Sequence, residues 1–210
     1  MKSLYCRVIK RVVDLLFLVL FSPVWIPLML VLSLIVKLTS PGPVLFMQKR
    51  IGKCRREFTI YKFRSMYCTA PKDTPTHMLE NPEVFITPIG RFLRKSSLDE
   101  LPQILNIIRG ELTLVGPRPA LWNQDDLIAE REKYGANDIT PGLTGLAQTK
   151  GRDELPIEVK ARYDGEYCTG ISFISDIKIL ILTVVAVFRS EGVVEGCTGV
   201  VRSGDDEVDL

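Results

Sequence analysis

The apolar segment from Val12 to Val36 is the feature that most limits how this chain can fold. About 20 apolar residues cross the hydrocarbon core of a bilayer, so the segment is long enough for a membrane helix. Ser22-Pro23 and Pro27 interrupt it near its middle, where each proline removes a main-chain hydrogen bond from a helix. The pattern therefore favours a helix that is broken at Ser22-Pro23 inside the membrane.

Basic residues flank this segment on both sides. They are Lys2, Arg7, Lys10 and Arg11 before it, and Lys37, Lys49, Arg50, Lys53, Arg55 and Arg56 after it. Because Lys and Arg mark the cytoplasmic side of a membrane, a re-entrant hairpin that returns to its starting face explains these charges better than a straight span. A cleaved signal peptide fits least, since the apolar run is too long and no small-x-small cleavage site follows it. Asp14 is costly in hydrocarbon, so we expect it near the interface, paired with Arg11.

The composition excludes several kinds of chemistry. Five scattered cysteines without a C-x-x-C pair argue against a disulfide framework or a zinc site, and fit a reducing compartment. A histidine-dependent triad would have to rest on His77, the one histidine in the chain. The net charge of +2 does not indicate a nucleic-acid partner, and we expect none. Chemistry here is therefore expected from carboxylates, cations and an oxygen-loving ion such as Mg²⁺.

The remaining elements indicate an α+β fold. The expected elements are strands at Val44–Gln48 and Phe58–Phe63 forming a hairpin, a loop from Pro71 to Pro88, a buried strand at Leu112–Val115, an exposed charged helix from Asp125 to Tyr134, and an apolar helix from Ile177 to Phe188 capped by Ser175-Asp176. The last helix is too short to span a membrane and can be either a core helix or an interfacial one.

Two adjacent carboxylates, Asp99 and Glu100, stand between a basic stretch and an apolar helical run. Ser97 followed by Glu100 matches a capping box, whereas Pro102 also fits the first position of a helix. Either register places both carboxylates at a helix N-terminus, where the helix dipole favours negative charge. The pair can therefore be a helix cap, or a nucleophile held ready for a phosphate.

Arginines on glycine- and proline-rich loops suit a diphosphate ligand. Arg94, Arg118 between two prolines, and Arg152 after Gly151 can each bind phosphate oxygens through two N–H groups. An aspartate is ionised at neutral pH and can attack phosphorus once cations and Mg²⁺ neutralise the phosphoryl oxygens. The alternative from the residues alone is a non-catalytic membrane adaptor that binds anionic lipid through its basic flank.

Five runs of residues resemble the bacterial sugar transferase family, the monotopic polyprenyl-phosphate phosphoglycosyl transferases, in its minimal form. They are Phe46-x-Gln48-x-Arg50-x-Gly52, Lys62 to Met66, Ser97 to Gln103, Leu114 to Pro119 and Pro141 to Gly145. The resemblance extends over about residues 10–190 and implies transfer of a sugar-1-phosphate from a UDP-sugar to undecaprenyl phosphate, with release of UMP. It also implies a location on the cytoplasmic face of the bacterial inner membrane.

The resemblance assigns roles to particular residues. Asp99 is implied as the nucleophile of a covalent phosphosugar intermediate, and Glu100 as an assistant through Mg²⁺ or as a base. The implied phosphate- or nucleotide-binding residues are Arg94, Arg118, Lys62, Arg64 and Arg152. Ser22-Pro23 matches the family's helix break. We therefore expect an α+β protein with a re-entrant anchor over residues 1–38, a small β-hairpin and a mainly helical catalytic domain with interfacial helices over 39–190, and a tail over 191–210.

Several points stay open beside the resemblance. Gly151-Arg152-Asp153 replaces a Gly-Arg-Asn found in some relatives, and this leaves the identity of the sugar undecided. A conventional glycosyltransferase that uses Asp99 as a base would release UDP instead of UMP. The glycan pathway and the oligomeric state, including a homodimer, are not decided by the sequence.

Overall fold

The computed structural model describes residues 5–71, 79, 81–151 and 155–189. In chain order the helices are the π-helical turn η1 (Tyr5–Ile9), α1 (Lys10–Leu20), α2 (Ser22–Thr39), η2 (Lys53–Arg55), η4 (Pro82–Phe85), α3 (Pro88–Lys95), η5 (Leu98–Gln103), α4 (Ile104–Arg109), α5 (Asp125–Glu132), η6 (Ala136–Asp138), α6 (Leu146–Thr149), α7 (Ile157–Thr169) and α8 (Phe173–Arg189). The strands are β1 (Leu45–Ile51), β2 (Glu57–Phe63), β3 (Thr113–Val115) and β4 (Gly142–Thr144). The α+β prediction is confirmed, whereas predictions for His77, Arg152 and the tail lie outside the described residues.

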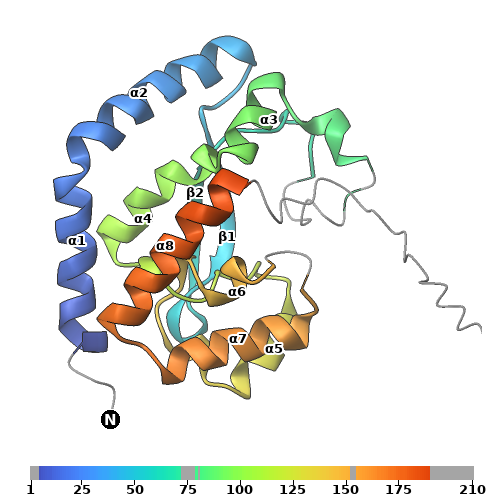
Figure 1. The fold of residues 1–210 in the computed structure, drawn as a ribbon. Coiled ribbons are helices and arrows are strands. Elements are labelled where there is room, and N and C mark those ends of the chain that lie inside the picture. The colour runs from blue at the N-terminus through green and yellow to red at the C-terminus, as the bar shows by residue number, and fades with distance from the viewer. Residues whose placement is uncertain (1–4, 72–78, 80, 152–154, 190–210) are drawn as a thin grey trace, which may run out of the picture.

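The apolar segment forms two helices that meet at Phe21. Two carbonyls next to the break are satisfied by side chains: Ser22 Oγ donates to the Val19 carbonyl at 2.7 Å, and Trp25 Nε1 donates to the Leu18 carbonyl at 2.8 Å. Figure 1 shows α1 along one side of the molecule and α2 turning away from it across the top. The helix is thus interrupted at Phe21, next to Ser22-Pro23, without leaving these carbonyls unpaired.

We call α1 and α2 together the anchor, after the expectation from the sequence, and both helices are tied to the rest of the domain. Lys10 pairs with Asp176 of α8, and Arg11 donates to the carbonyls of Ile107 and Ile108 at the end of α4. At the other end of the anchor, Arg64 Nη2 donates to the Ser40 carbonyl at 2.7 Å. The first and last residues of the bent segment are thus held by one folded domain.

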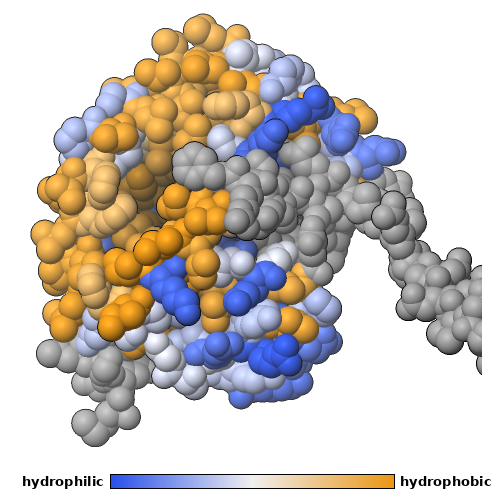
Figure 2. All heavy atoms as spheres, in the orientation of Figure 1, coloured by the Kyte–Doolittle hydropathy of each residue, from blue (hydrophilic) through white to orange (hydrophobic). Residues whose placement is uncertain are grey.

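The outer surface of the anchor is apolar. Among the described residues, one helix is long and apolar enough to cross a membrane, Ser22–Thr39, with a mean hydropathy of 1.8 and 11% of that stretch buried. Figure 2 shows apolar side chains gathered over α1, α2 and α8, and polar ones over the region of α5 and α7. In α8 one side packs into the core at Ile179, while Ile174 and Ile181 on the other are exposed. The helix is therefore a core helix on one side, and its opposite side is apolar and exposed.

The hairpin β1–β2 is antiparallel and confirms the predicted strands, with Phe46 opposite Lys62 and Gln48 opposite Ile60. Because directly opposed residues share a face, Lys62, Gln48 and Arg50 point to the same side of the hairpin. The buried strand predicted at Leu112–Val115 is β3, and it pairs in parallel with β4, which the sequence did not predict. A Cβ on Gly142 would lie 2.1 Å from the Gly116 nitrogen, so only glycine allows β4 to approach this closely.

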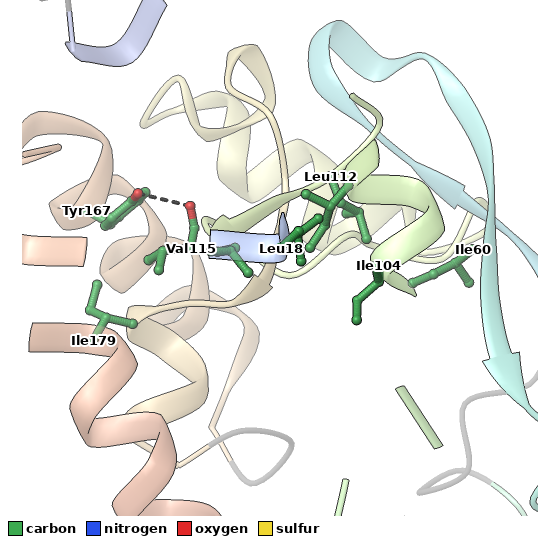
Figure 3. Close-up of a cluster of buried hydrophobic side chains, with 9 residues drawn as sticks. Leu18, Ile60, Ile104, Leu112, Val115, Tyr167 and Ile179 are labelled. Atoms are coloured by element: carbon green, nitrogen blue, oxygen red, sulfur yellow. Dashed lines mark hydrogen bonds between the residues drawn. The ribbon is translucent and has the colours of Figure 1, made fainter. Parts of the chain in front are cut away.

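Two clusters of buried apolar side chains join these elements. The larger cluster includes Leu18, Ile60, Ile104, Leu112, Val115, Tyr167 and Ile179, and Figure 3 shows the Tyr167 hydroxyl hydrogen-bonded to the Val115 carbonyl. The smaller cluster contains Leu32, Val36, Phe63 and Leu93. The inner sides of α1 and α2 thus belong to the same core as the hairpin and η5, which fixes the anchor relative to the site described below.

Three local predictions about polar residues were wrong. Asp14 does not pair with Arg11, which donates to the end of α4; Asp14 is buried and accepts hydrogen bonds from the Thr113 hydroxyl and the Leu114 amide, because its side of α1 faces β3. Asp176 does not cap α8, which begins at Phe173; instead the Ser172 and Ser175 hydroxyls each accept a hydrogen bond from the other residue's amide across the first turn. Helix α5 is not exposed on all sides, since Leu127 and Arg131 are buried.

Candidate active site

The Asp99-Glu100 pair lies in the first turn of the 3-10 helix η5. The capping box predicted for Ser97 and Glu100 is wrong: Ser97 has a left-handed backbone with φ of 56°, and its side chain caps no amide. Pro102 has no N–H for an α-helical ladder, and the α-helix begins only at Ile104. Both carboxylates still stand at a helix start, as either register required.

Glu100 is held by two cations. Its Oε1 atom lies 2.7 Å from Lys62 Nζ of β2 and 2.7 Å from Arg118 Nη2, and its Oε2 accepts a longer contact of 3.4 Å from Arg118 Nη1. Burial alone would raise the pKa of this carboxyl, but Arg118 and Lys62 outweigh that effect and hold the pKa well below its usual range. Glu100 is therefore ionised and firmly oriented.

Asp99 has a different environment from its neighbour. The residue is 7% exposed, and burial raises the pKa of its carboxyl to about 6, although Lys62, Arg94 and Arg118 act in the opposite direction. The negative charge of Glu100 adds to the rise. Two adjacent carboxyls thus have pKa values pushed apart, an arrangement typical of sites in which one carboxylate reacts and the other organises the site.

A cavity of about 350 Å³ opens beside Asp99. Its polar lining includes Gln48, Arg50, Lys62, Arg94 and Asp99, and its apolar lining includes Leu45, Phe63, Met66 and Leu79. Cations at one part of a cavity with apolar walls suit a ligand that carries phosphate and a less polar portion. The cavity extends to Pro43, four residues after the membrane-type helix α2 ends at Thr39.

The structure brings together most of the side chains that the sequence singled out. Lys62, Arg94, Asp99, Glu100 and Arg118 meet from β2, α3, η5 and the turn after β3. Arg64 also lines the cavity, but its guanidinium donates to the carbonyls of Pro43 and Ser40 and to Ser40 Oγ. We therefore place Arg64 at the junction of α2 with β1, apart from the cations that surround Asp99.

Two residues of this site were quoted in a sequence motif without being given a role. Gln48 and Arg50 line the cavity from β1, on the same hairpin face as Lys62. The available signal was their spacing of two within a strand, which places them on one face. The register that puts this face beside Lys62 depends on how the two strands pair.

The carboxylates of this site could hold Mg²⁺ only together with oxygens of a substrate. Among residues 5–71, 79, 81–151 and 155–189, no group of three or more His, Cys, Asp or Glu side chains could form an all-protein metal cage. Mg²⁺ is commonly bound through one or two carboxylates together with substrate phosphates. Asp99 and Glu100 fit that pattern, with Asp99 the carboxylate that faces the cavity.

Comparison with known proteins agrees with this geometry. The profile of the family described as bacterial sugar transferase matches residues 5–190. The uncharacterized sugar transferase EpsL of Bacillus subtilis is 43% identical over 159 residues, covering 76% of this chain and 77% of that protein. The UDP-glucose:undecaprenyl-phosphate glucose-1-phosphate transferase of Caulobacter vibrioides is 38% identical, covering 87% of this chain and 70% of that protein.

A third relative is longer and carries a different sugar in its name. The UDP-N-acetylgalactosamine-undecaprenyl-phosphate N-acetylgalactosaminephosphotransferase of Aeromonas hydrophila is 35% identical over 189 residues. These cover 88% of this chain but 44% of that protein, so the chain spans less than half of this relative. The two named sugars differ among relatives of similar identity, and overall similarity therefore does not identify the sugar.

Proposed function

This chain belongs to the bacterial sugar transferase family, and from its site we propose that it transfers a sugar-1-phosphate from a UDP-sugar to undecaprenyl phosphate. The observation that supports the proposal is that the two carboxylates have different partners. Glu100 is engaged by Lys62 and Arg118, whereas Asp99 faces the cavity among cations. Asp99 is thus the carboxylate available to react with a bound diphosphate.

The proposed reaction has two displacements at the same phosphorus. An Asp99 carboxylate oxygen attacks the phosphorus that bears the sugar, and the bond from this phosphorus to the bridging oxygen breaks, so that UMP leaves. An oxygen of undecaprenyl phosphate then attacks the phosphorus of the aspartyl-phosphosugar and displaces the Asp99 carboxylate. The products are UMP and a sugar on a lipid diphosphate, the starting point for assembling a glycan.

The cations have separate parts in this scheme. Arg94 and Lys62 line the cavity and can bind phosphoryl oxygens. Arg118 is not part of that lining but pairs with Glu100, and we propose that it binds the nucleotide phosphate. A carboxylate whose pKa is held low by two cations is a weak proton acceptor, so we propose that Glu100 acts mainly by orienting Lys62 and Arg118. Mg²⁺, held by Asp99, Glu100 and substrate phosphates, would neutralise charge on the phosphoryl oxygens.

The nucleotide product tests this proposal. Purified protein in detergent, incubated with short-chain polyprenyl phosphate and a panel of UDP-sugars, is expected to release UMP with one of them. Chelation with EDTA should stop the reaction, and added Mg²⁺ should restore it. Release of UDP would instead indicate a conventional glycosyltransferase and would rule out an aspartyl-phosphosugar route.

We further propose that the anchor is re-entrant and that the protein lies on the cytoplasmic face of the bacterial inner membrane. Lys10 and Arg11 at its start and Ser40 at its end contact the same domain, which cannot lie on both sides of a bilayer. Helix α2 is about 27 Å long at 1.5 Å per residue, and the break at Phe21 separates it from α1. The exposed apolar side of α8 would lie in the same interface.

The topology is testable with epitope tags. Tags before Lys2 and after Leu210 are both expected to be protected from protease in intact cells and cleaved after lysis. A periplasmic protein cleaved in intact cells serves as the positive control. Cleavage of the N-terminal tag in intact cells would mean that the segment spans the membrane.

A further inference from the structure

The Pro117-Arg118-Pro119 turn has few main-chain groups by which it can be held. Neither proline has an N–H, so the turn is fixed largely through its carbonyls. The Pro117 carbonyl accepts a hydrogen bond from the Gly142 amide of β4 at 2.9 Å. The Pro119 carbonyl accepts one from Arg50 Nη1 of β1 at 3.1 Å. Two different elements thus hold the two sides of Arg118.

Arg50 is itself held in a fixed orientation. Its Nε and Nη2 atoms both donate to Gln48 Oε1, at 3.1 Å and 2.7 Å. Gln48 is 8% exposed, so the accepting amide sits in a largely buried position. The next residue, Ile51, donates its amide to the Ala120 carbonyl at 2.9 Å, which extends β1 along the exit of the turn. The Arg50 guanidinium therefore links β1 rigidly to the Pro119 carbonyl, and we call this link the strut.

We propose that Arg50 is a positioning residue which sets the angle of Arg118, and that Gln48 fixes Arg50 for this purpose. The inference rests on the proposed function, because that proposal assigns Arg118 to the nucleotide phosphate. One hairpin face carries both Arg50 and Lys62, so the same rigid unit places the two cations that meet on Glu100. A shift of about 1 Å in such a group can lower a rate by roughly 10²-fold.

The chemistry of the strut requires arginine. A guanidinium has donors in a planar fork, so it reaches Gln48 through two N–H groups and Pro119 through a third. A lysine at position 50 has the same charge but a single nitrogen, and it cannot reproduce this geometry. Charge and geometry can therefore be separated by substitution at one position.

The test is a double-mutant cycle on Arg50 and Arg118. Arg118→Met is expected to lower kcat/KM by roughly 10²-fold or more, and Arg50→Met by about 10- to 100-fold. The double variant should be no slower than Arg118→Met, because Arg50 acts through Arg118. Additive losses would overturn the inference, since they would mean that Arg50 contacts the substrate directly or acts on stability alone.

Three further variants complete the design. Arg50→Lys should lose nearly as much activity as Arg50→Met, and near-wild-type activity in it would also overturn the inference. Arg55→Met is the matched control, because Arg55 belongs to the same hairpin but pairs with Glu132 on the surface. If Arg50→Met lowers the thermal unfolding midpoint, the cycle is repeated with Gln48→Met, which releases the strut and keeps the arginine.

The two proposals fail separately in this experiment. The nucleotide that the wild-type protein releases tests the reaction type. The coupling between positions 50 and 118 is measured on the rate of that release, whether the product is UMP or UDP. If the wild-type protein releases UMP but substitutions at positions 50 and 118 have additive effects, the positioning role is overturned and the proposed reaction stands.

Discussion

Replacing Asp99 with asparagine is expected to lower transfer by at least about 10³-fold while leaving the protein folded and bound to membranes. Asparagine keeps the size of the side chain but cannot form the acyl-phosphate bond. Because the loss falls on the step that releases UMP, both UMP release and lipid product formation should disappear. The measurement is UMP release from the UDP-sugar that the wild-type protein uses.

The same substitution should raise the thermal unfolding midpoint by a few degrees at neutral pH. Burial raises the pKa of Asp99 to about 6, above its ordinary value of 3.8, so the folded protein favours the neutral carboxyl. The ionised carboxylate therefore destabilises the fold fully above pH 6, and this penalty is relieved as the pH falls from about 6 to about 4. Asparagine removes the penalty, so the variant's advantage should shrink over that pH range.

Asp125→Asn is a suitable control, because Asp125 is an exposed aspartate in the first turn of α5. It is expected to leave both UMP release and the unfolding midpoint close to those of the wild-type protein. Full transfer by Asp99→Asn would remove Asp99 from the role of nucleophile. An unfolding midpoint that falls would contradict the view that its carboxylate is held at a cost to stability.

The sequence predicted features that depend on local chemistry. The break at Ser22-Pro23 follows from the missing N–H of proline, and the hairpin follows from alternating apolar residues around a polar turn. The placement of Asp99 and Glu100 at a helix start also follows locally, although Pro102 produced a 3-10 turn and not a capping box. These features were predictable because each depends on residues that are neighbours in the chain.

Features that depend on distant partners were missed. From its neighbours in the chain, Asp176 was predicted to cap a helix. In the fold it accepts hydrogen bonds from Tyr167 and from Tyr5, which lies 171 positions away. From its neighbours in the chain, Asp14 was predicted to be a charge that pairs with Arg11. In the fold it accepts hydrogen bonds from Thr113 and Leu114 of β3, about 100 positions away. The strand β4 has three residues, too few for a periodic pattern, and its pairing with β3 rests on close approach between glycines. No single-sequence pattern contains these pairings.

The buried ion pair between α5 and α7 shows why a charge pattern alone is a weak guide to exposure. The Asp125–Tyr134 stretch looked like a solvated helix, but Arg131 Nη2 lies 2.6 Å from Asp164 Oδ2, and the two side chains are 7% and 1% exposed. Burial raises the pKa of the Asp164 carboxyl despite the adjacent guanidinium. Such a pair contributes little beyond an apolar pair of similar size, but each partner depends strongly on the other.

Asp164→Asn is therefore expected to lower the free energy of unfolding by about 3–5 kcal/mol, because it leaves the Arg131 charge buried without its counter-ion. For a chain of this size that loss corresponds to roughly 10 °C in the thermal unfolding midpoint.

The double variant Arg131→Met/Asp164→Leu should recover most of the loss, since both charges are then absent. Arg55→Met, which opens an exposed pair to Glu132, should leave the midpoint unchanged. A fall in the double variant as large as in Asp164→Asn would contradict the view that the loss comes from the unpaired Arg131 charge.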